Sequence, residues 1–483
     1  MKIVIIGAGV AGCAAYLELR KHIPQISSIT IYEAYDTDKD TIAEQREHGP
    51  THSSTLLVGG GLAVAPNGLG VLQRLDEGLL RDVTRGGYVT SHSNLKDKNG
   101  NVLMRIEPNS DSQGDSARPA SHMHAVACSR HSLWRCLRSR IPNEHIVNKM
   151  VTDITANADG RNFVRFVDGS DPVEADLVIG ADGVHSTAKR ALFPESPEDP
   201  YQPNYEGLVG IGGFVSTADV KEFVEKGSMN FVFGGSGFFG YFFSESCSSN
   251  SHRDSPFHIS EPGESLAWWS TYEIKECPDR KSIDIQDVLC QLRKRHAGWN
   301  DPVVQRILES ATVRNMYPTW TSPELPTWEC EGVVLLGDAA HALPPTSGQG
   351  VSQALEDCEA FVLFLAHQID KRTEDQSSTE KATLKQAINR AAKKYVTLRQ
   401  PRVKEILKVA QKMQNSKRSM GVIQEYTMYT FMKIFGVPQA SKPLWVSPNI
   451  VTGLFPSLVA KPTRKVIEYN IADEVAKVLV AEG

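Results

Sequence analysis

The first stretch of the chain constrains the fold more than any other. An apolar run over residues 2–6 predicts a short buried strand, the motif GAGVAG follows at once, and residues 13–22 predict a helix. In such a unit Gly7 allows a tight turn, Gly9 lets the backbone approach a pyrophosphate, and Gly12 lets the helix pack closely on the strand. The phosphates then meet the positive end of the helix. The sequence therefore predicts an α/β fold with a parallel sheet that binds a dinucleotide.

A second apolar strand, over residues 28–32, ends in Glu33. A carboxylate at that point can accept both hydroxyls of an adenosine ribose and disfavours a 2′-phosphate, so FAD or NAD fits better than NADP. A disulfide reductase would add a second GxGxxG and a redox cysteine pair, and a nicotinamide dehydrogenase would add a hydride-transfer site. Neither pattern follows in this sequence, and its eight cysteines form no Cys-x-x-Cys pair, which also argues against a zinc site.

Length and charge narrow the class of protein further. A chain of 483 residues suggests two or three domains. Its net charge of −5 and the lack of a long Lys/Arg run argue against a nucleic-acid partner. No run of 18 apolar residues predicts a membrane span. We expect a cytoplasmic protein with reduced cysteines, no membrane span and no metal site.

Two later motifs continue the pattern. DLVIGADGVHSTAKRALF, at 176–193, predicts a buried strand that leads through Asp182-Gly183 into a helix, and GDAAHALPPTSGQG, at 337–350, follows another predicted strand at 332–336. Together with GAGVAG, Glu33 and Arg130 in SRHSLWRCL, these motifs resemble the group A flavin monooxygenases, the para-hydroxybenzoate hydroxylase-like FAD enzymes. That family includes salicylate hydroxylases and fungal natural-product hydroxylases and epoxidases. GGGLAVAPNG, at 59–68, resembles the family's segment beside the flavin more loosely.

The resemblance implies roles around FAD for the 337–350 motif. Asp338 is placed to hydrogen-bond a ribityl hydroxyl, with a helix cap or turn aspartate as its alternative. Pro344 and Pro345 would form a stiff wall without backbone donors. Beyond them a helix would open with its positive end toward the flavin's pyrimidine edge; its first residues are Gly348, Gln349, Gly350 and Val351. His341 is expected to be structural.

The remaining cofactor contacts are implied in the same way. Arg130 would open a helix and reach FAD, unless it is a surface arginine. Asp182 would help to hold the pyrophosphate region, unless it is a strand-to-helix cap. Gly61 and Ala63 would lie against the isoalloxazine, followed by a rigid turn at 66–68.

Aromatic residues fill the strands predicted between residues 196 and 325. Phe231 and Phe233 share one face of a strand, as Phe239, Tyr241 and Phe243 share one face of the next, so one face of this antiparallel sheet could cover a substrate pocket. Ordinary sheet core is the alternative for any single residue. We predict Tyr241 as the polar, catalytic group at that pocket.

The expected architecture combines three regions. A Rossmann-type, glutathione-reductase-like FAD-binding domain comprises 1–75, 110–195 and 326–370. An antiparallel β-sheet substrate domain comprises 76–109 and 196–325. A C-terminal helical region, 371–483, begins with a polar linker at 373–383. A long helix is expected at 384–414, interrupted near Pro401. The spacing of Tyr395, Arg399 and Arg402 on it resembles that of the family's helix behind the flavin domain. A final helix is expected at 467–481 and could help to form a homodimer.

The resemblance also implies a reaction. NADPH or NADH reduces FAD, O2 adds at the flavin C4a carbon, and the resulting hydroperoxide gives one oxygen atom to an aromatic or polycyclic small molecule. A flavin-dependent halogenase is disfavoured because its Trp-x-Trp-x-Ile-Pro signature is absent. A flavin reductase or dehydrogenase without oxygen insertion stays open, as does a non-catalytic binding protein resembling a Rab GDP-dissociation inhibitor.

Overall fold

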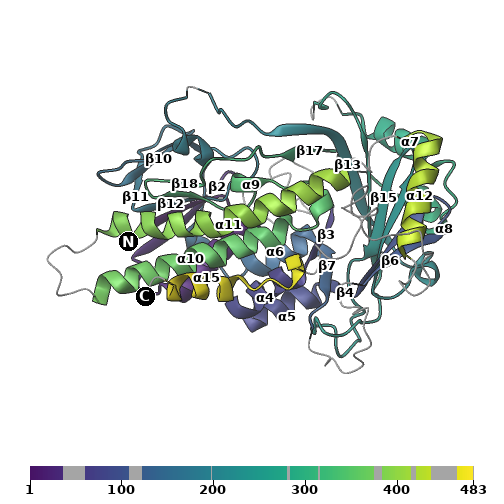
Figure 1. The fold of residues 1–483 in the computed structure, drawn as a ribbon, viewed down its shortest axis with the longest axis horizontal. Coiled ribbons are helices and arrows are strands. Elements are labelled where there is room, and N and C mark those ends of the chain that lie inside the picture. Colours follow the sequence, from purple (N-terminus) through teal and green to yellow (C-terminus); the bar gives the residue numbers. More distant parts are fainter. Residues whose placement is uncertain are drawn as a thin grey trace.

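Two large sheets and a group of long helices make up most of the molecule (Figure 1). The computed structural model describes residues 1–35, 60–107, 122–196, 198–279, 283–313, 316–374, 383–414, 420–436 and 465–481. Most of the linker expected at 373–383 lies outside the described residues.

A six-stranded, mostly parallel sheet contains the N-terminal strand at its centre. Ile3 of the central strand pairs with Ile29 on one side and with Leu177 on the other, both in parallel. The central strand is almost wholly buried, which explains its continuous apolar sequence. The strands, from one edge to the other, are β18 (Glu329–Cys330), β19 (Val333–Leu335), β12 (Leu177–Gly180), β1 (Lys2–Ile6), β2 (Ser28–Glu33) and β8 (Ile146–Asn148).

Helices pack around this sheet and share its core. The two longest, α10 and α11, lie side by side across it, and α1 and α4 pack on α10 (Figure 1). The helices of this part are α1 (Val10–His22), α4 (Pro66–Leu75), α5 (Glu77–Arg85), α6 (Arg130–Arg138), α9 (Asp338–His341), α10 (Gly350–Glu374), α11 (Leu384–Gln414) and α15 (Ile471–Val480). Two small sheets accompany them: β3 (Gly61–Val64), β7 (Ala125–Ser129) and β4 (Gly87–Thr90), and β11 (Val173–Ala175), β10 (Asn162–Phe166) and β9 (Val151–Thr155).

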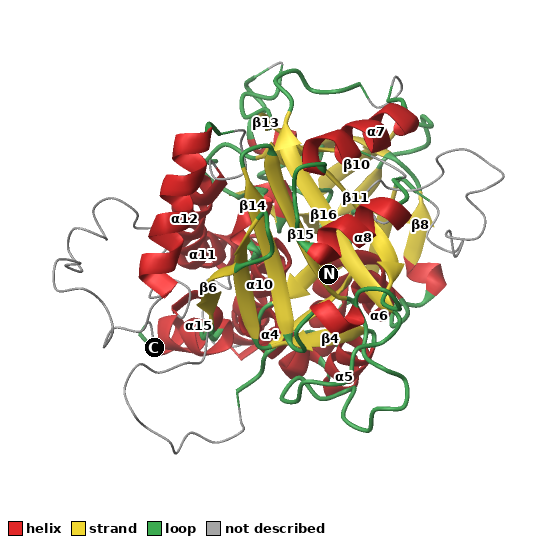
Figure 2. Cartoon of the chain, turned by 90° about the vertical axis from the view of Figure 1, so that its right-hand side faces the viewer, coloured by secondary structure: helices red, strands yellow, loops and turns green. Residues whose placement is uncertain are grey.

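The second large sheet has seven strands. It is antiparallel except where β14 and β5 run in parallel. One face packs against α7 (Ile285–His296) and α8 (Pro302–Ser310), and α12 (Val422–Gly436) lies near the β6 edge (Figure 2). The strands, in spatial order, are β17 (Tyr317–Thr321), β13 (Asn204–Ser216), β16 (Ser265–Glu273), β15 (Gly237–Phe243), β14 (Ser228–Gly234), β5 (His92–Asp97) and β6 (Val102–Ile106).

Several local expectations are corrected. The predicted turn at 66–68 is the start of α4, because Pro66 occupies a first-turn position that needs no backbone donor. A short 3-10 helix, Ala188–Leu192, follows β12 in place of the predicted α-helix. α11 has the predicted bounds but continues through Pro401 without a break. The final helix is shorter than predicted, and α12 was not predicted at all.

Candidate active site

A single cavity of about 2100 Å³ connects the two large sheets. Drug-sized ligands commonly occupy pockets of roughly 300 to 1,000 Å³, so this cavity has room for more than one such molecule. Of the predicted cofactor-binding residues, all except Gly12 line it. These are Gly7, Gly9, Glu33, Gly61, Ala63, Arg130, Asp182, Asp338, Pro345, Gly348, Gly350 and Val351.

The glycine-rich turn has the geometry that its sequence predicts. Gly7 has φ of +96°, and a Cβ placed there would lie 2.5 Å from the Ala181 carbonyl oxygen. A Cβ on Gly12 would lie 1.9 Å from the carbonyl oxygen of Gly7, so this glycine packs the helix on the turn and does not face the cavity. A Cβ on Gly9 would meet no atom within 4 Å. Gly9 therefore leaves open cavity at the helix N-terminus, where a pyrophosphate would bind.

Glu33 lies at the end of β2 beside this turn. One carboxylate oxygen accepts a hydrogen bond of 2.6 Å from the Ala8 amide, and the other accepts one of 3.1 Å from the Tyr35 amide. Burial raises the pKa of Glu33, although these amide contacts oppose the shift. A carboxylate has about four acceptor sites, so lone pairs remain for ribose hydroxyls. The indole of Trp134, which sequence reasoning missed, donates to the Ala8 carbonyl at 2.7 Å and anchors the turn to α6.

Asp182 lines the cavity, but its carboxylate already has partners in its own turn. One oxygen accepts from the Ser186 hydroxyl at 2.6 Å, and the other accepts from the amides of Thr187 and Ala188 at 2.7 and 3.1 Å. Burial raises the pKa of Asp182. These hydrogen bonds match the alternative role of Asp182 as a cap of the following turn. A contact between Asp182 and the cofactor stays a prediction.

The 337–350 motif forms one wall of the cavity. Gly337 has φ of +60° and precedes α9, and a Cβ there would lie 3.1 Å from that of Ala354. Asp338 is the first residue of α9, and its exposed side chain lines the cavity. Pro344 and Pro345 follow, Gly348 has φ of +58°, and α10 begins at Gly350 with its N-terminus at the cavity. Such a helix end offers free backbone N–H groups to an electron-rich ring edge.

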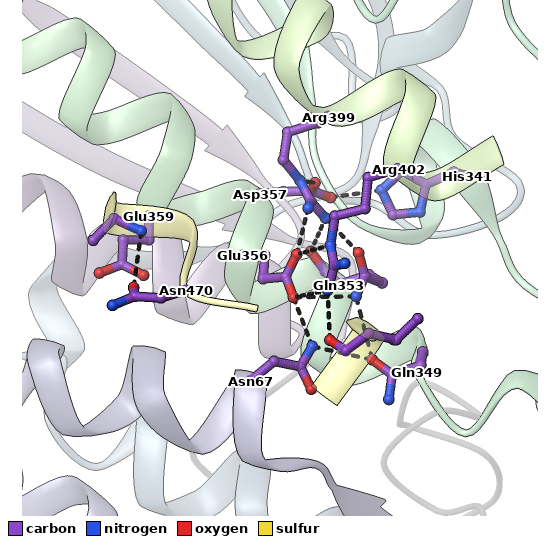
Figure 3. Close-up of polar contacts among 12 residues, drawn as sticks. Asn67, His341, Gln349, Gln353, Glu356, Asp357, Glu359, Arg399, Arg402 and Asn470 are labelled. Atoms are coloured by element: carbon purple, nitrogen blue, oxygen red, sulfur yellow. Dashed lines mark hydrogen bonds and ion pairs between the residues drawn. The ribbon is translucent and has the colours of Figure 1, made fainter. Parts of the chain in front are cut away.

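A largely buried ion network lies behind this wall (Figure 3). Arg399 of α11 donates through Nε to Asp357 at 2.9 Å and also pairs with Glu356, and all three side chains are 0% exposed. Arg402 donates twice to Glu356, at 2.8 Å each. Burial alone would raise the pKa of Asp357, but the charges of His341 and Arg399 and their hydrogen bonds hold it below its ordinary value. The two carboxylates and the two arginines thus compensate one another.

The network connects separate parts of the cavity wall. Asp357 accepts from the Gly337 amide at 3.0 Å and contacts His341 at 2.6 Å. Glu356 accepts from Asn67 of α4 at 2.6 Å, and Asn67 also donates to Gln349 at 3.1 Å. His341 is buried and does not line the cavity, in agreement with its predicted structural role.

The aromatic face of the seven-stranded sheet forms the far wall of the cavity. Phe231, Phe233, Phe238, Phe242 and Trp269 all line it. The predicted alternation of these strands is confirmed: Phe231 and Phe233 both line the cavity, and Phe239 and Phe243 both lie in the core on the other face.

Tyr241 lies on the other face, and its predicted place at the pocket is wrong. Its side chain is 0% exposed, belongs to the core beneath α7 and α8, and does not line the cavity. The Tyr241 hydroxyl accepts from the Lys96 ammonium at 2.7 Å and donates to Asp301 at 3.2 Å. These polar groups explain why a hydroxyl sits in this core, and burial raises the pKa of Tyr241 well above its ordinary value.

Replacing Tyr241 with phenylalanine should therefore affect stability and not catalysis. The Tyr241→Phe variant leaves Lys96 and Asp301 without their shared partner, and we expect a loss of about 1 to 3 kcal/mol in the free energy of unfolding. Urea denaturation, bound FAD and the rate of NAD(P)H oxidation are the measurements. Tyr88→Phe, at another buried tyrosine away from the cavity, is the matched control. A Tyr241→Phe enzyme of normal stability without oxidation activity would contradict this placement.

Comparison with known proteins agrees with the geometry. The profile of a family described as "FAD binding domain" matches residues 1–392, so the chain belongs to that family. The FAD-dependent monooxygenase nodY2 of Hypoxylon pulicicidum is 25% identical over 388 residues, which cover 76% of this chain and 75% of that protein. The Asperlicin C monooxygenase of Petromyces alliaceus is 23% identical over 394 residues, covering 76% and 72%.

Solved structures share the fold. HpxO of Klebsiella pneumoniae, complexed with FAD and uric acid, superposes with a TM-score of 0.66 at 20% identity and covers 96% of this chain and 98% of that one. A salicylate hydroxylase substrate complex gives a TM-score of 0.63 at 17% identity, covering 99% and 97%. The protein is a flavoprotein monooxygenase of group A, with FAD as cofactor, in a family that uses NAD(P)H.

Two further observations concern membranes and metal ions. None of the described helices is both long and apolar enough to cross a membrane. Within the described ranges, no group of three or more His, Cys, Asp or Glu residues is placed to hold a metal ion.

Proposed function

We propose that this protein consumes NAD(P)H and transfers one oxygen atom from O2 to an aromatic or polycyclic small molecule held against the aromatic face of its seven-stranded sheet. The observation that carries the proposal is the continuity of the cavity. The same space is lined by the glycine-rich turn at one end and by Phe231, Phe242 and Trp269 at the other. A cofactor and an apolar substrate can therefore be enclosed together.

The residues at the cofactor end fit FAD. Gly9 leaves room for the pyrophosphate, Glu33 offers acceptors for ribose hydroxyls, and Asp338 presents a carboxylate to the cavity. When bound, FAD would supply the redox chemistry, receiving electrons from NAD(P)H and activating O2. The positive end of α10 would stabilise negative charge on a reduced ring by about 0.3 to 2 kcal/mol.

The residues at the other end would position the substrate and exclude water. Aromatic side chains favour flat ring systems through offset or edge-to-face contacts. Gly61 packs so closely on Phe242 that a Cβ there would lie 2.2 Å from the ring, which holds β3 against the aromatic face. The closeness of Gly61 to Phe242 supports a substrate held next to the flavin. The names of related proteins, among them a urate hydroxylase and an Asperlicin C monooxygenase, support ring compounds as the substrate class.

One experiment separates oxygen transfer from the two alternatives, a dehydrogenase or reductase and a non-catalytic binding protein. The purified protein should carry FAD, and a panel of neutral and acidic ring compounds should include one that accelerates NAD(P)H oxidation and gains a labelled atom from isotopically labelled O2. Accelerated oxidation without label in the product would favour a dehydrogenase or reductase. Protein that cannot be loaded with FAD would favour a binding protein.

A further inference from the structure

The two ends of the cavity differ in charge. Ionisable side chains such as Glu33, Arg130 and Asp338 line the end formed by the FAD-binding part. Charged residues of α11 also line the cavity, and this helix packs on the 345–347 segment of the same part; they are Arg402, Glu405 and Lys408. The seven-stranded sheet and α12 contribute apolar residues and a few uncharged polar ones. Of the described lining residues on these elements, none is Asp, Glu, Lys, Arg or His.

This difference bears on which molecules can enter the apolar end. A carboxylate moved from water into an apolar site without a partner suffers a large desolvation penalty. Lys96, a sheet cation with a buried side chain, lies on the opposite face with Tyr241 and Asp301. A neutral ring compound suffers no such penalty at the aromatic face.

Helix α12 completes this apolar end. Met420, just before the helix, and Gln424, Met428, Phe431 and Met432 on it all line the cavity. Their spacing of three to four residues places them in one stripe along the helix. The family match ends at residue 392, so α12 lies outside the part of the chain shared with the family profile.

Polar contacts fix this stripe toward the cavity. The Tyr429 hydroxyl lies 2.7 Å from the Phe233 carbonyl and 2.8 Å from Glu425, and Glu425 forms an ion pair of 2.9 Å with Lys98. The Met420 amide donates to the Gly235 carbonyl at 3.0 Å. Because these contacts join α12 to β14 and to the β5–β6 turn, rotation of the helix would break them. The outer face carries Ile423, which is 83% exposed.

We propose that α12 is the substrate-selecting wall of this cavity and that the substrate is an uncharged, apolar ring compound without a carboxylate. Met428 and Phe431 contact the substrate where it lies against the aromatic face. Methionine side chains adapt to irregular shapes, so this wall limits size and charge more than it limits the exact ring pattern. The inference rests on the proposed function, because it assigns the substrate class of the same site.

A ring-matched pair of probes tests the charge preference. Methyl naphthoate and naphthoate share one ring system and differ in charge, and their binding to the FAD-loaded protein can be followed by naphthyl fluorescence. We expect the ester to bind roughly tenfold or more tightly than the acid. Equal affinities, tighter binding of the acid, or no binding of the ester would overturn the assignment.

Variants of α12 test the wall itself. Met428→Trp adds a ring on the cavity side and should weaken binding of the ester by roughly tenfold, with bound FAD unchanged. Ile423→Trp adds the same ring on the exposed face and is the matched control. Met428→Ala removes atoms only, so it stays informative should the tryptophan variant not fold. It should shift the binding preference from methyl naphthoate toward the methyl ester of the larger pyrenecarboxylate. Equal effects of Met428→Trp and Ile423→Trp, or no shift with Met428→Ala, would refute the role of α12.

The readouts keep this inference distinct from the proposed function. Loss of FAD loading or of label transfer from O2 concerns the proposed function alone. The affinity ratio of ester to acid and the effects of the Met428 variants concern this inference alone, because fluorescence reports binding without turnover.

Discussion

The Gly9→Glu variant should fold normally and fail to hold FAD. Gly9 has φ of −70°, which any residue adopts, and a Cβ at this position would meet no atom within 4 Å. The new side chain therefore projects into the cavity at the N-terminus of α1. A carboxylate there takes the place expected for the cofactor's pyrophosphate and repels it. Two unit charges of the same sign about 4 Å apart repel by roughly 4 kcal/mol at an effective dielectric constant of about 20, which weakens affinity on the order of a thousandfold.

The measurement is the amount of FAD bound per protein after gel filtration, with circular dichroism and urea denaturation of the apoprotein as checks on folding. Gly298→Glu is the matched control, because a Cβ on Gly298 would likewise meet no atom within 4 Å and this glycine lies away from the cavity. The control should retain FAD. Normal FAD content in Gly9→Glu would mean that the pyrophosphate binds elsewhere, and the site would have to be reassigned.

The cofactor end was predictable because its signals are local in sequence. β1 has the predicted bounds, β2 ends at Glu33 as expected, and α1 starts only three residues earlier than predicted. A strand, a glycine turn and a helix follow one another within 22 residues, and each glycine has a steric reason that the sequence reveals. The same holds for 337–350, where two prolines and two glycines determine the path of the backbone.

The substrate end was less predictable, because its geometry depends on long-range packing. Alternation shows that Phe239 and Tyr241 share a face, but only the packing of α7 and α8 decides that this face is core and not cavity. α12 has hydrophobic residues on most of its circumference, so its sequence does not indicate which side meets a sheet. The partners of Arg399 in the ion network are 42 to 46 residues away in sequence, beyond the reach of periodicity arguments.

Arg399→Leu should cause the largest loss of stability among single substitutions in this network. Removing the guanidinium leaves Glu356 and Asp357 buried with Arg402 as their remaining arginine. Breaking a buried ion pair in this way typically costs about 3 to 5 kcal/mol, because one charge stays desolvated without compensation. Asp357 also accepts from the Gly337 amide beside Asp338, so the variant should bind FAD more weakly as well.

Acid should narrow the difference in the free energy of unfolding between the wild type and Arg399→Leu. In the wild type the pKa of Asp357 is lowered, so its stabilising contribution is complete above the unfolded pKa of about 3.9 and is lost only as pH falls through the folded value. Without Arg399, burial should raise the pKa of Asp357 above its unfolded value. The free energy of unfolding of the variant is then lowered most near neutral pH. The variant regains part of this lost stability as protons bind below that raised pKa.

Urea denaturation of the apoproteins at neutral pH and at about pH 5, within the range where both proteins are folded, measures both effects. Arg165→Leu is the control for loss of an arginine, because Arg165 pairs with Asp153 at the exposed surface and such pairs contribute little. Arg399→Lys keeps the charge but loses the planar fork, so an intermediate stability is expected, and this variant remains informative if Arg399→Leu does not accumulate. A penalty for Arg399→Leu no larger than that for Arg165→Leu would show that Arg402 and His341 compensate both carboxylates by themselves. The wall that carries Asp338 would then be held by packing, and the ion network would serve to orient Gln349 at the cavity through Asn67.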